Sequence, residues 1–529
     1  MRQLNGHDAS FLYSENSHAN SNVTLIQIYD QSSAPGGKVR FKSVMAHIES
    51  RLERSPMFRN KLLRVPFDID HPYWVEDENF DLEYHVRHIA LPKPGDWRQF
   101  CIQASRIHAR PLDMNRPLWE IYVVEGLDSF VDLPAGSFAL LIKLHHAAVD
   151  VEHGQSMGLM LHDLTPEISK PEPPKPWFPE PEPGRLALIY KSVKSAVFAP
   201  RRFLRPTASA LRRVAPAAVH FFQDLLFDVV EMTSTRFNSV VSPYRVFDTR
   251  RFTVDEFRAI RRLVPKSTMN DAIIAVCAGS LRRYLQIHDE LPTRPLTAAA
   301  PIYVRESGRN ANGNDGAMAV SWMQVGLATH IDDPVERLRQ IHEQTAGSDL
   351  AERGVSARQL TDLTQHSPVV TLALASKLLA KAAARVGNRV PLANCTITNV
   401  PGSGVPLYLN GARMTYFSAI MPISDGMGLV FAVTSYDGRI IISPTSCRYL
   451  MPDPDVFSQC IRDSFQEYLA LAQQLPVVVP KRKATAVKRA GSRGSASGTR
   501  SPSRPTAKKA AKRLPAAPGD PRRSRAPSG

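Results

Sequence analysis

The chain has 529 residues, of which 43% are hydrophobic, and its formal net charge is +16. This length predicts two domains, the hydrophobic share is that of a soluble globular protein, and the lack of any run of about 18 apolar residues argues against a membrane-spanning helix. The charge is uneven, because the fifteen Lys or Arg and one Asp between Lys481 and Gly529 carry +14 and leave +2 for the rest of the chain.

Residues 1–165 combine alternating apolar runs with segments of helical spacing, which indicates an α/β unit. We expect strands at 23–29, 119–124 and 138–144, and helices at 41–52 and 97–108. Residues 166–245 form a different region. Their proline-rich part, 171–183, predicts a stiff extended linker.

A basic stretch with helical spacing follows at 191–213, and a further helix is expected at 217–232. Lysines and arginines interleaved with large apolar residues are typical of helices that lie on a membrane surface, although an ordinary helix packed on the protein body has the same pattern. A second basic amphipathic segment, 372–385, allows the same two interpretations.

A second α/β unit is predicted for residues 246–475. We expect helices at 268–285 and 334–344, strands at 296–304 and 318–327, and a hairpin that turns at Asp437-Gly438. The similar size and composition of the two units suggest a pseudo-duplicated architecture. The tail, 476–529, lacks periodicity and large apolar residues, so we expect it to be disordered.

The five cysteines are scattered, which favours reduced thiols in a cytosolic setting and argues against a zinc ribbon. The first residues lack an apolar stretch, so we expect no secretory signal.

The segment from His145 to Asp150 carries the clearest chemical signal. Two histidines end a predicted buried strand, and Asp150 stands four residues after His146. Imidazole titrates near neutral pH, so a histidine here can act as a general base. Two other interpretations remain: a structural strand end with Asp150 capping a helix, and a metal site made by His146, Asp150 and His153.

Residues 145–150, His-His-Ala-Ala-Val-Asp, resemble the H-H-x-x-x-D-G motif of the bacterial wax ester synthase/diacylglycerol acyltransferase family, which belongs with the acyl-CoA-dependent acyltransferases of the chloramphenicol acetyltransferase type. Further segments resemble family landmarks in the expected order. They are 4–12, the Pro117-Leu118-Trp119 element, the Asn270-Asp271 pair, 300–305, 313–314 and 398–402.

The resemblance implies two chloramphenicol acetyltransferase-like halves, each a mixed sheet flanked by helices, with the active site at their interface. It also implies fatty acyl transfer from acyl-CoA to diacylglycerol or a long-chain alcohol, with acyl-CoA as co-substrate and neither a metal nor a bound cofactor. His146 would be the general base, and His145 a neighbour that shapes the site. Asp150 would be structural, orienting the loop through an arginine.

The same resemblance gives supporting roles to residues elsewhere in the chain. Asn270 and Asp271 would support the site from the second half, and Asn270 also fits a helix N-cap. Pro117, Leu118 and Trp119 would pack near the acyl tunnel, with ordinary core packing as the alternative for Trp119.

Val151 departs from the family motif, which has a glycine after the aspartate. A rival hypothesis is therefore a catalytically impaired lipid-binding or scaffold protein, and a second rival is a condensation-type acyltransferase on the same fold. For the enzyme we expect a cytoplasmic protein at the periphery of an anionic membrane or lipid droplet. The tail lacks interleaved aromatic residues and a recognisable fold, so sequence-specific nucleic-acid binding is not expected.

Overall fold

The computed structural model describes residues 1–68, 70–130, 133–134, 136–149, 160–168, 176–198, 233–305, 318–346 and 393–475. These residues belong to one compact unit, Met1–Pro476. The helices expected at 217–232 and 372–385, the motif at 313–314 and the tail 476–529 lie outside the described residues.

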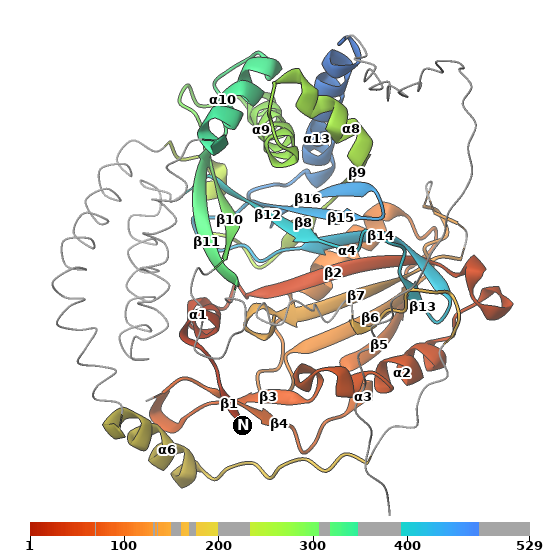
Figure 1. Ribbon diagram of the computed structural model, residues 1–529, viewed down its shortest axis with the longest axis vertical. Coiled ribbons are helices and arrows are strands. Elements are labelled where there is room, and N and C mark those ends of the chain that lie inside the picture. The colour runs from red at the N-terminus through yellow and green to blue at the C-terminus, as the bar shows by residue number, and fades with distance from the viewer. Residues whose placement is uncertain are drawn as a thin grey trace, which may run out of the picture. The chain divides into compact units, whose positions relative to one another are not determined.

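A six-stranded mixed sheet dominates the N-terminal part of the chain (Figure 1). Its strands, in spatial order, are β13 (Tyr408–Leu409), β14 (Ala412–Ile420), β2 (Asn22–Asp30), β7 (Phe138–His145), β6 (Trp119–Glu125) and β5 (Val86–Ala90). All neighbours are antiparallel except β5 and β6. The strands expected at 23–29, 119–124 and 138–144 are confirmed as β2, β6 and β7.

A seven-stranded mixed sheet forms the C-terminal part. Its strands are β11 (Met318–Gly326), β10 (Thr297–Arg305), β12 (Cys395–Pro401), β15 (Val430–Tyr436), β16 (Arg439–Cys447) and β8 (Arg245–Phe247), with β9 (Arg250–Thr253) also paired to β16. The predicted hairpin is confirmed, because β15 and β16 pair antiparallel from Tyr436 and Arg439 onward. Asp437 and Gly438 both have positive φ, as the tight turn requires.

The two large sheets are not built from separate halves of the sequence that divide at residue 246. Strand β14 comes from the C-terminal segment but pairs with β2 along most of its length, so it extends the N-terminal sheet (Figure 1). Together these sheets confirm the expected mixed α/β fold with two lobes. The division of the chain into segments 1–165, 166–245 and 246–475 stays a prediction. Strand β14, from the last segment, pairs with β2, from the first.

A small three-stranded sheet and the helices complete the described fold (Figure 1). The small sheet contains β1 (Arg2–Gln3), β4 (Tyr73–Glu76) and β3 (Asn60–Leu63). The helices are α1 (Gly6–Ser14), α2 (Phe41–Glu49), α3 (Leu82–His85), α4 (Trp97–Ala109), α6 (Arg185–Phe198), α8 (Val254–Ile260), α9 (Met269–Ile287), α10 (Pro334–Ala346) and α13 (Pro454–Gln473). Helices α8, α9, α10 and α13 pack against one another beside the C-terminal sheet.

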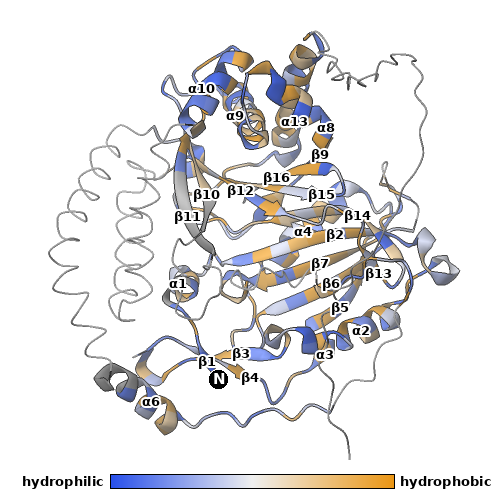
Figure 2. Cartoon of the chain, in the orientation of Figure 1, coloured by the Kyte–Doolittle hydropathy of each residue, from blue (hydrophilic) through white to orange (hydrophobic). Residues whose placement is uncertain are grey.

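Hydrophobic residues concentrate on the central strands, whereas α10 and α13 also present hydrophilic residues (Figure 2). Every residue of β7 is buried, as expected of a strand covered on both faces. No helix in the described parts of the chain is both long enough and apolar enough to cross a membrane.

Helix α2 is shorter than its periodicity predicts, because it ends at Glu49 and a separate 3-10 turn begins at Leu52. The chain turns here to bury Arg51, which forms an ion pair with Asp163 at 2.5 Å. This partner lies 112 residues away, so helical periodicity alone could not have predicted where the helix ends.

Candidate active site

The histidine pair stands where β7 ends and a short 3-10 turn, η6 (His146–Ala148), begins. The backbone N–H of His145 donates to the carbonyl of Leu118 at 3.0 Å, and that of His146 donates to the carbonyl of Ser21 at 2.9 Å. The turn is therefore held from both sides, by the residues that precede β6 and β2. This places the pair on a rigid strand end, as a catalytic side chain requires.

The imidazole of His145 is fully buried and bonded on both sides. Its Nδ1 accepts a hydrogen bond from the backbone N–H of Ala147 at 3.1 Å. In the neutral ring the proton must then be on Nε2, which donates to Oε1 of Glu15 at 3.1 Å. Because both ring nitrogens are engaged by the protein, His145 is poorly placed to take a proton from a substrate.

The imidazole of His146 is only half-buried and stacks on the ring of Phe11 in α1. The two ring centroids are 3.9 Å apart with an interplanar angle of 21°. This contact gives a physical role to the N-terminal segment, since α1 packs directly on η6. Stacking fixes the plane of the imidazole, which favours His146 as the base of the pair.

Glu15 is a site residue that the sequence analysis missed. It follows α1, and its Oε1 also accepts a hydrogen bond from the backbone N–H of Ser21 at 2.6 Å. The Glu15 carboxylate therefore binds the His145 ring and also Ser21, whose carbonyl accepts the backbone N–H of His146. No motif marks Glu15, because its partner His145 lies 130 residues further along the chain.

We expect Glu15→Ala to lower kcat for acyl transfer about tenfold to a hundredfold with little change in KM, because His145 loses the acceptor that fixes its tautomer. Glu15→Gln should retain most activity, since an amide oxygen can still accept both hydrogen bonds. The matched control is Glu49→Ala, which removes an exposed carboxylate at the end of α2. Equal losses in the Ala and Gln variants, or a change in KM alone, would contradict the positioning role.

The Pro117-Leu118-Trp119 element is buried core. Leu118 packs with Ala147 and Ala148 of η6, and its carbonyl binds the N–H of His145. The Trp119 ring stacks on His85 with a centroid separation of 4.4 Å, and its indole N–H donates to the carbonyl of Phe58 at 3.0 Å. The element therefore supports the end of β7 through the backbone and through apolar packing.

The Asn270-Asp271 pair lies in the first turn of α9. The interpretation of Asn270 as N-cap is wrong: Thr268 is the N-cap, and Asn270 is an exposed residue inside the helix. Asp271 is buried, completes a capping box with Thr268, and accepts hydrogen bonds from His342 and Thr345 of α10 at 2.8 Å each.

These hydrogen bonds hold the pKa of Asp271 below its usual value although burial acts in the opposite direction. Its hydrogen bonds with described residues join α9 to α10 and do not extend to η6. The structure therefore gives Asp271 a structural position and does not bring it together with the two histidines through any of these bonds.

Asp150 and Val151 lie outside the described residues, as do His153 and Gly154. The expected arginine partner of Asp150 therefore stays a prediction. Among the residues that the structure describes, no three His, Cys, Asp or Glu side chains form a group suited to a metal ion. Two of the three ligands in the rival metal hypothesis, Asp150 and His153, lie outside the described residues.

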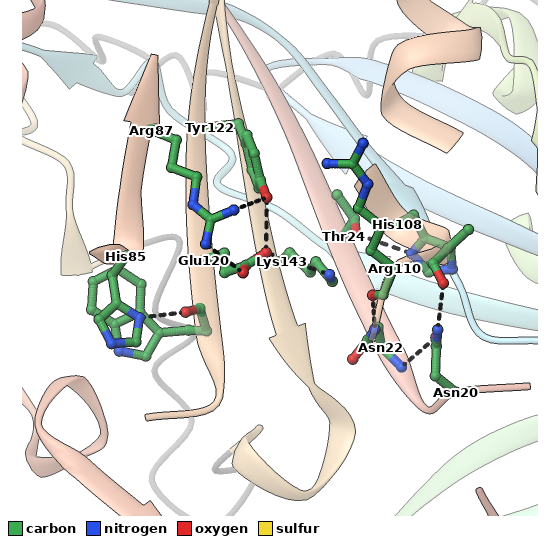
Figure 3. Close-up of polar contacts among 12 residues, drawn as sticks. Asn20, Asn22, Thr24, His85, Arg87, His108, Arg110, Glu120, Tyr122 and Lys143 are labelled. Atoms are coloured by element: carbon green, nitrogen blue, oxygen red, sulfur yellow. Dashed lines mark hydrogen bonds and ion pairs between the residues drawn. The ribbon is translucent and has the colours of Figure 1, made fainter. Parts of the chain in front are cut away.

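A buried polar network joins β5, β6 and β7 (Figure 3). Because side chains alternate along β7, this network lies on the sheet face that also carries His145. Lys143, two residues earlier on β7, is fully buried with its Nζ 3.5 Å from Oε2 of Glu120. Arg87 and Tyr122 converge on the same carboxylate, at 3.2 and 3.0 Å. Burial lowers the pKa of Lys143 to about 8, although Glu120 partly opposes the shift.

A buried histidine lies next to this network. Thr24 pairs with Lys143 in the β2–β7 ladder and also contacts Nδ1 of His108 at 3.0 Å. Burial, followed by the charges of Arg245 and Lys143, lowers the pKa of His108 well below its ordinary value. Burial therefore favours the neutral form of the His108 imidazole.

We expect wild type to gain stability relative to Lys143→Met as the pH rises from about 8 to about 10.5. In this range the unfolded chain retains the lysine proton and the folded chain releases it, so the free energy of unfolding increases with pH. The full gain should be on the order of 3 kcal/mol. Urea unfolding at pH 7.5 and 10 measures it, with the exposed Lys42→Met as control. If the free energies of unfolding of wild type and Lys143→Met differed by the same amount at both pH values, a lowered pKa of Lys143 would be excluded.

The turn that carries Glu15 and Ser21 also contacts the C-terminal segment. His18 pairs with Asp425 at 3.0 Å, and the Arg245 guanidinium donates to the carbonyl of His18 at 2.8 Å. The residues that hold the histidine pair are therefore tied to the C-terminal segment, in agreement with a site between the two halves.

Comparison with known proteins identifies the family. Residues 4–273 match the wax ester synthase/diacylglycerol acyltransferase catalytic domain, and residues 318–468 match the WS/DGAT C-terminal domain. An O-acyltransferase WSD of Acinetobacter baylyi is 31% identical over 415 residues, which cover 75% of this chain and 81% of the relative. A candidate diacylglycerol O-acyltransferase of Mycobacterium tuberculosis is 29% identical, with 90% of this chain and 92% of the relative covered.

A solved structure has the same fold. It is the wax ester synthase/diacylglycerol acyltransferase from Marinobacter aquaeolei VT8, with a TM-score of 0.63, 24% identity, and coverage of 89% of this chain and 100% of that chain. The resemblance drawn from the histidine motif and its companion segments is thus confirmed. The chain belongs to the wax ester synthase/diacylglycerol acyltransferase family and is an acyltransferase of that family.

Proposed function

We propose that this protein transfers a fatty acyl group from acyl-CoA to the hydroxyl group of a diacylglycerol or a long-chain alcohol, which forms triacylglycerol or a wax ester. The observation that carries the proposal is the division of roles in the histidine pair. His145 has both ring nitrogens bonded to protein groups, whereas His146 is half-buried on a rigid strand end. We therefore assign the role of general base to His146, whose ring plane is held by Phe11.

In the proposed reaction His146 accepts the proton of the acceptor hydroxyl as the oxygen attacks the thioester carbonyl. The C–S bond then breaks, the ester forms, and the imidazolium returns the proton to the leaving CoA thiolate. Phe11 keeps the imidazole plane in place, and Glu15 with His145 fixes the backbone that carries it. Asp150 orients the same loop and takes no proton, and neither a metal nor a bound cofactor is needed.

The roles proposed for the remaining motif residues are structural. Asp271 keeps the start of α9 docked on α10, which supports the C-terminal side of the site. Leu118 supports His145 through its carbonyl, and Trp119 supports the packing behind it. Asn270 is exposed on the first turn of α9 and stays a supporting residue by family resemblance.

Incubation of the purified full chain with palmitoyl-CoA and either dioleoylglycerol or hexadecanol tests the proposal. We expect acceptor-dependent release of free thiol, measured by a thiol reagent, together with triacylglycerol or wax ester in the lipid extract. Thiol release that does not depend on an acceptor would indicate a thioesterase. Inactivity with every acceptor would favour the impaired lipid-binding or scaffold homologue that Val151 suggests, and transfer only to amine or carrier-bound acceptors would favour the condensation-type alternative.

The proposal also implies contact with a lipid surface, and α6 offers a candidate surface for it. Leu188 of α6 is buried against Val65, Tyr73 and Val75 of the small-sheet region. On the same helix Leu186 is 83% exposed and Tyr190 is 68% exposed. Lys191 and Lys194 of α6 are also exposed and suit an anionic lipid surface.

We expect Leu186→Ser combined with Tyr190→Ser to reduce flotation with vesicles of phosphatidylglycerol and phosphatidylcholine at least several-fold, because each substitution removes apolar area that would enter the interface. The matched control is Val405→Ser, which alters an exposed apolar residue far along the chain. Unchanged flotation of the double variant would show that α6 is not the lipid-binding surface.

A further inference from the structure

A large cleft is lined by arginines, and neither His145 nor His146 is among its lining residues. Its volume is about 1450 Å³, which exceeds the roughly 300–1000 Å³ of ordinary small-molecule pockets. Helices α4 and α13 and the β8–β9 segment contribute most of its walls.

The charge of the cleft is strongly positive. Nine arginines and no lysine line it, against four carboxylates. Arg98 and Arg106 are eight residues apart on α4 and therefore lie on one face of that helix, while Arg462 faces the cleft from α13. Arginine offers a planar, permanently charged set of donors that matches phosphate oxygens.

Three of the four carboxylates in the cleft are engaged by groups other than the arginines of α4 and α13. Asp96 caps α4, and Glu256 accepts the N–H and hydroxyl of Thr253 at the start of α8. Asp248 is buried and accepts hydrogen bonds from the indole of Trp97, the N–H of Thr249 and the hydroxyl of Ser458. These three side chains stabilise the walls and do not neutralise the α4 and α13 arginines.

Several guanidinium groups in the cleft have no side-chain partner among the described residues. Arg250 pairs with Asp248, and Arg245 binds backbone carbonyls. Six others are exposed and make no ion pair or side-chain hydrogen bond with the residues that the structure describes. They are Arg98, Arg106, Arg110, Arg439, Arg448 and Arg462. These six arginines stand against one exposed cleft carboxylate, Asp455, and the resulting positive charge favours a ligand that carries several negative charges.

One end of the cleft reaches the segments that hold the histidines. Ala109 and Arg110 line it, and their carbonyls accept hydrogen bonds from the side chains of Asn20 and Asn22 at 2.9 and 3.0 Å (Figure 3). Asn22 stands opposite His145 in the β2–β7 ladder. Ser17, which also lines the cleft, follows Glu15 by two residues.

We propose that this cleft binds the 3′-phosphorylated adenosine diphosphate end of the acyl-CoA donor. The arginines of α4 and α13 pair with the phosphate groups, and the exposed ring of Tyr244 at the cleft is available to stack on the adenine. The pantetheine arm then leaves at the Ser17–Arg110 end, toward the segment that holds His145 and His146. The inference rests on the proposed function, because it assumes that the acyl donor is a CoA thioester.

The test uses Arg98→Gln combined with Arg106→Gln, and separately Arg462→Gln, in the full chain. The control is Arg261→Gln combined with Arg262→Gln, which alters two exposed arginines of the 3-10 turn η8 (Arg261–Leu263) outside the cleft. Calorimetry measures the Kd of adenosine 3′,5′-bisphosphate and of desulfo-CoA. Kinetics compare kcat/KM for decanoyl-CoA with kcat/KM for the decanoyl thioester of N-acetylcysteamine, which lacks the nucleotide.

We expect Kd for both nucleotides to rise about tenfold for each arginine removed, and the ratio of kcat/KM for the CoA donor over the short thioester to fall by a similar factor. The control should retain the wild-type Kd and ratio. His146→Ala should show the opposite pattern, with unchanged nucleotide Kd and loss of turnover with both donors.

An unchanged nucleotide Kd in both cleft variants would overturn the proposal. If the cleft variants also lost binding to phosphatidylglycerol vesicles while the nucleotide Kd stayed the same, the cleft would instead be a site for lipid headgroups. Arginine-dependent binding of adenosine 3′,5′-bisphosphate by a protein that is inert with every acyl donor would support the cleft assignment while it rejects acyl transfer. The two failures are therefore distinguishable.

Discussion

His146→Ala is expected to lower kcat for acyl transfer from palmitoyl-CoA by about a hundredfold to ten-thousandfold, the usual contribution of a positioned general base. The neighbouring His145 has both ring nitrogens bonded to protein groups, so it is poorly placed to replace His146 as the base. The KM for palmitoyl-CoA should change little, because the base contributes to the transition state more than to binding.

Two controls isolate the chemistry from the packing. Phe11→Leu removes the ring that stacks on His146 but leaves the imidazole, so it should cost far less activity than His146→Ala. His330→Ala removes an exposed histidine elsewhere and should have no effect. Turnover in His146→Ala within a few-fold of wild type would mean that another group accepts the proton, and the assignment of the base would be wrong.

Trp119→Ala is expected to lower the free energy of unfolding by about 3–5 kcal/mol, the cost of removing a large buried aromatic side chain. Trp119 is 1% exposed, stacks on His85 and lies edge-on to Phe58 with a centroid separation of 5.6 Å. Trp119→Phe keeps most of the volume but leaves the Phe58 carbonyl without its indole donor, which should cost about 1–3 kcal/mol.

Urea unfolding measures both losses, and Phe178→Ala, at an aromatic residue that is 85% exposed, is the control with an expected change below about 0.5 kcal/mol. The same variants decide between core and acyl tunnel. A core role predicts that Trp119→Phe keeps the ratio of kcat/KM for palmitoyl-CoA over octanoyl-CoA. A shifted ratio with unchanged stability would instead place the Trp119 ring against the acyl chain.

Local sequence patterns were sufficient for the elements that lead to the site. The run from Phe138 predicts β7 because a strand buried on both faces consists almost entirely of apolar residues. The Asp437-Gly438 pair predicts its hairpin because few residues tolerate the positive φ of that turn. Helix α9 follows from its apolar spacing, although its cap is Thr268 and not Asn270. Such signals depend on neighbouring residues, so they can be recognised without any knowledge of the fold.

The sequence by itself also determined the histidine pair and, through the ordered family landmarks, the acyltransferase family. Only the tertiary structure shows that both ring nitrogens of His145 are bonded and that His146 stacks on Phe11, since the Glu15 and Phe11 contacts join residues more than a hundred positions apart. It likewise placed β14 in the N-terminal sheet and gathered the arginines of α4 and α13 around one cleft. The physical reason is that the spacing of apolar residues indicates which side of a local segment is buried. Hydrogen bonds and charge clusters between distant segments form only once the chain has folded.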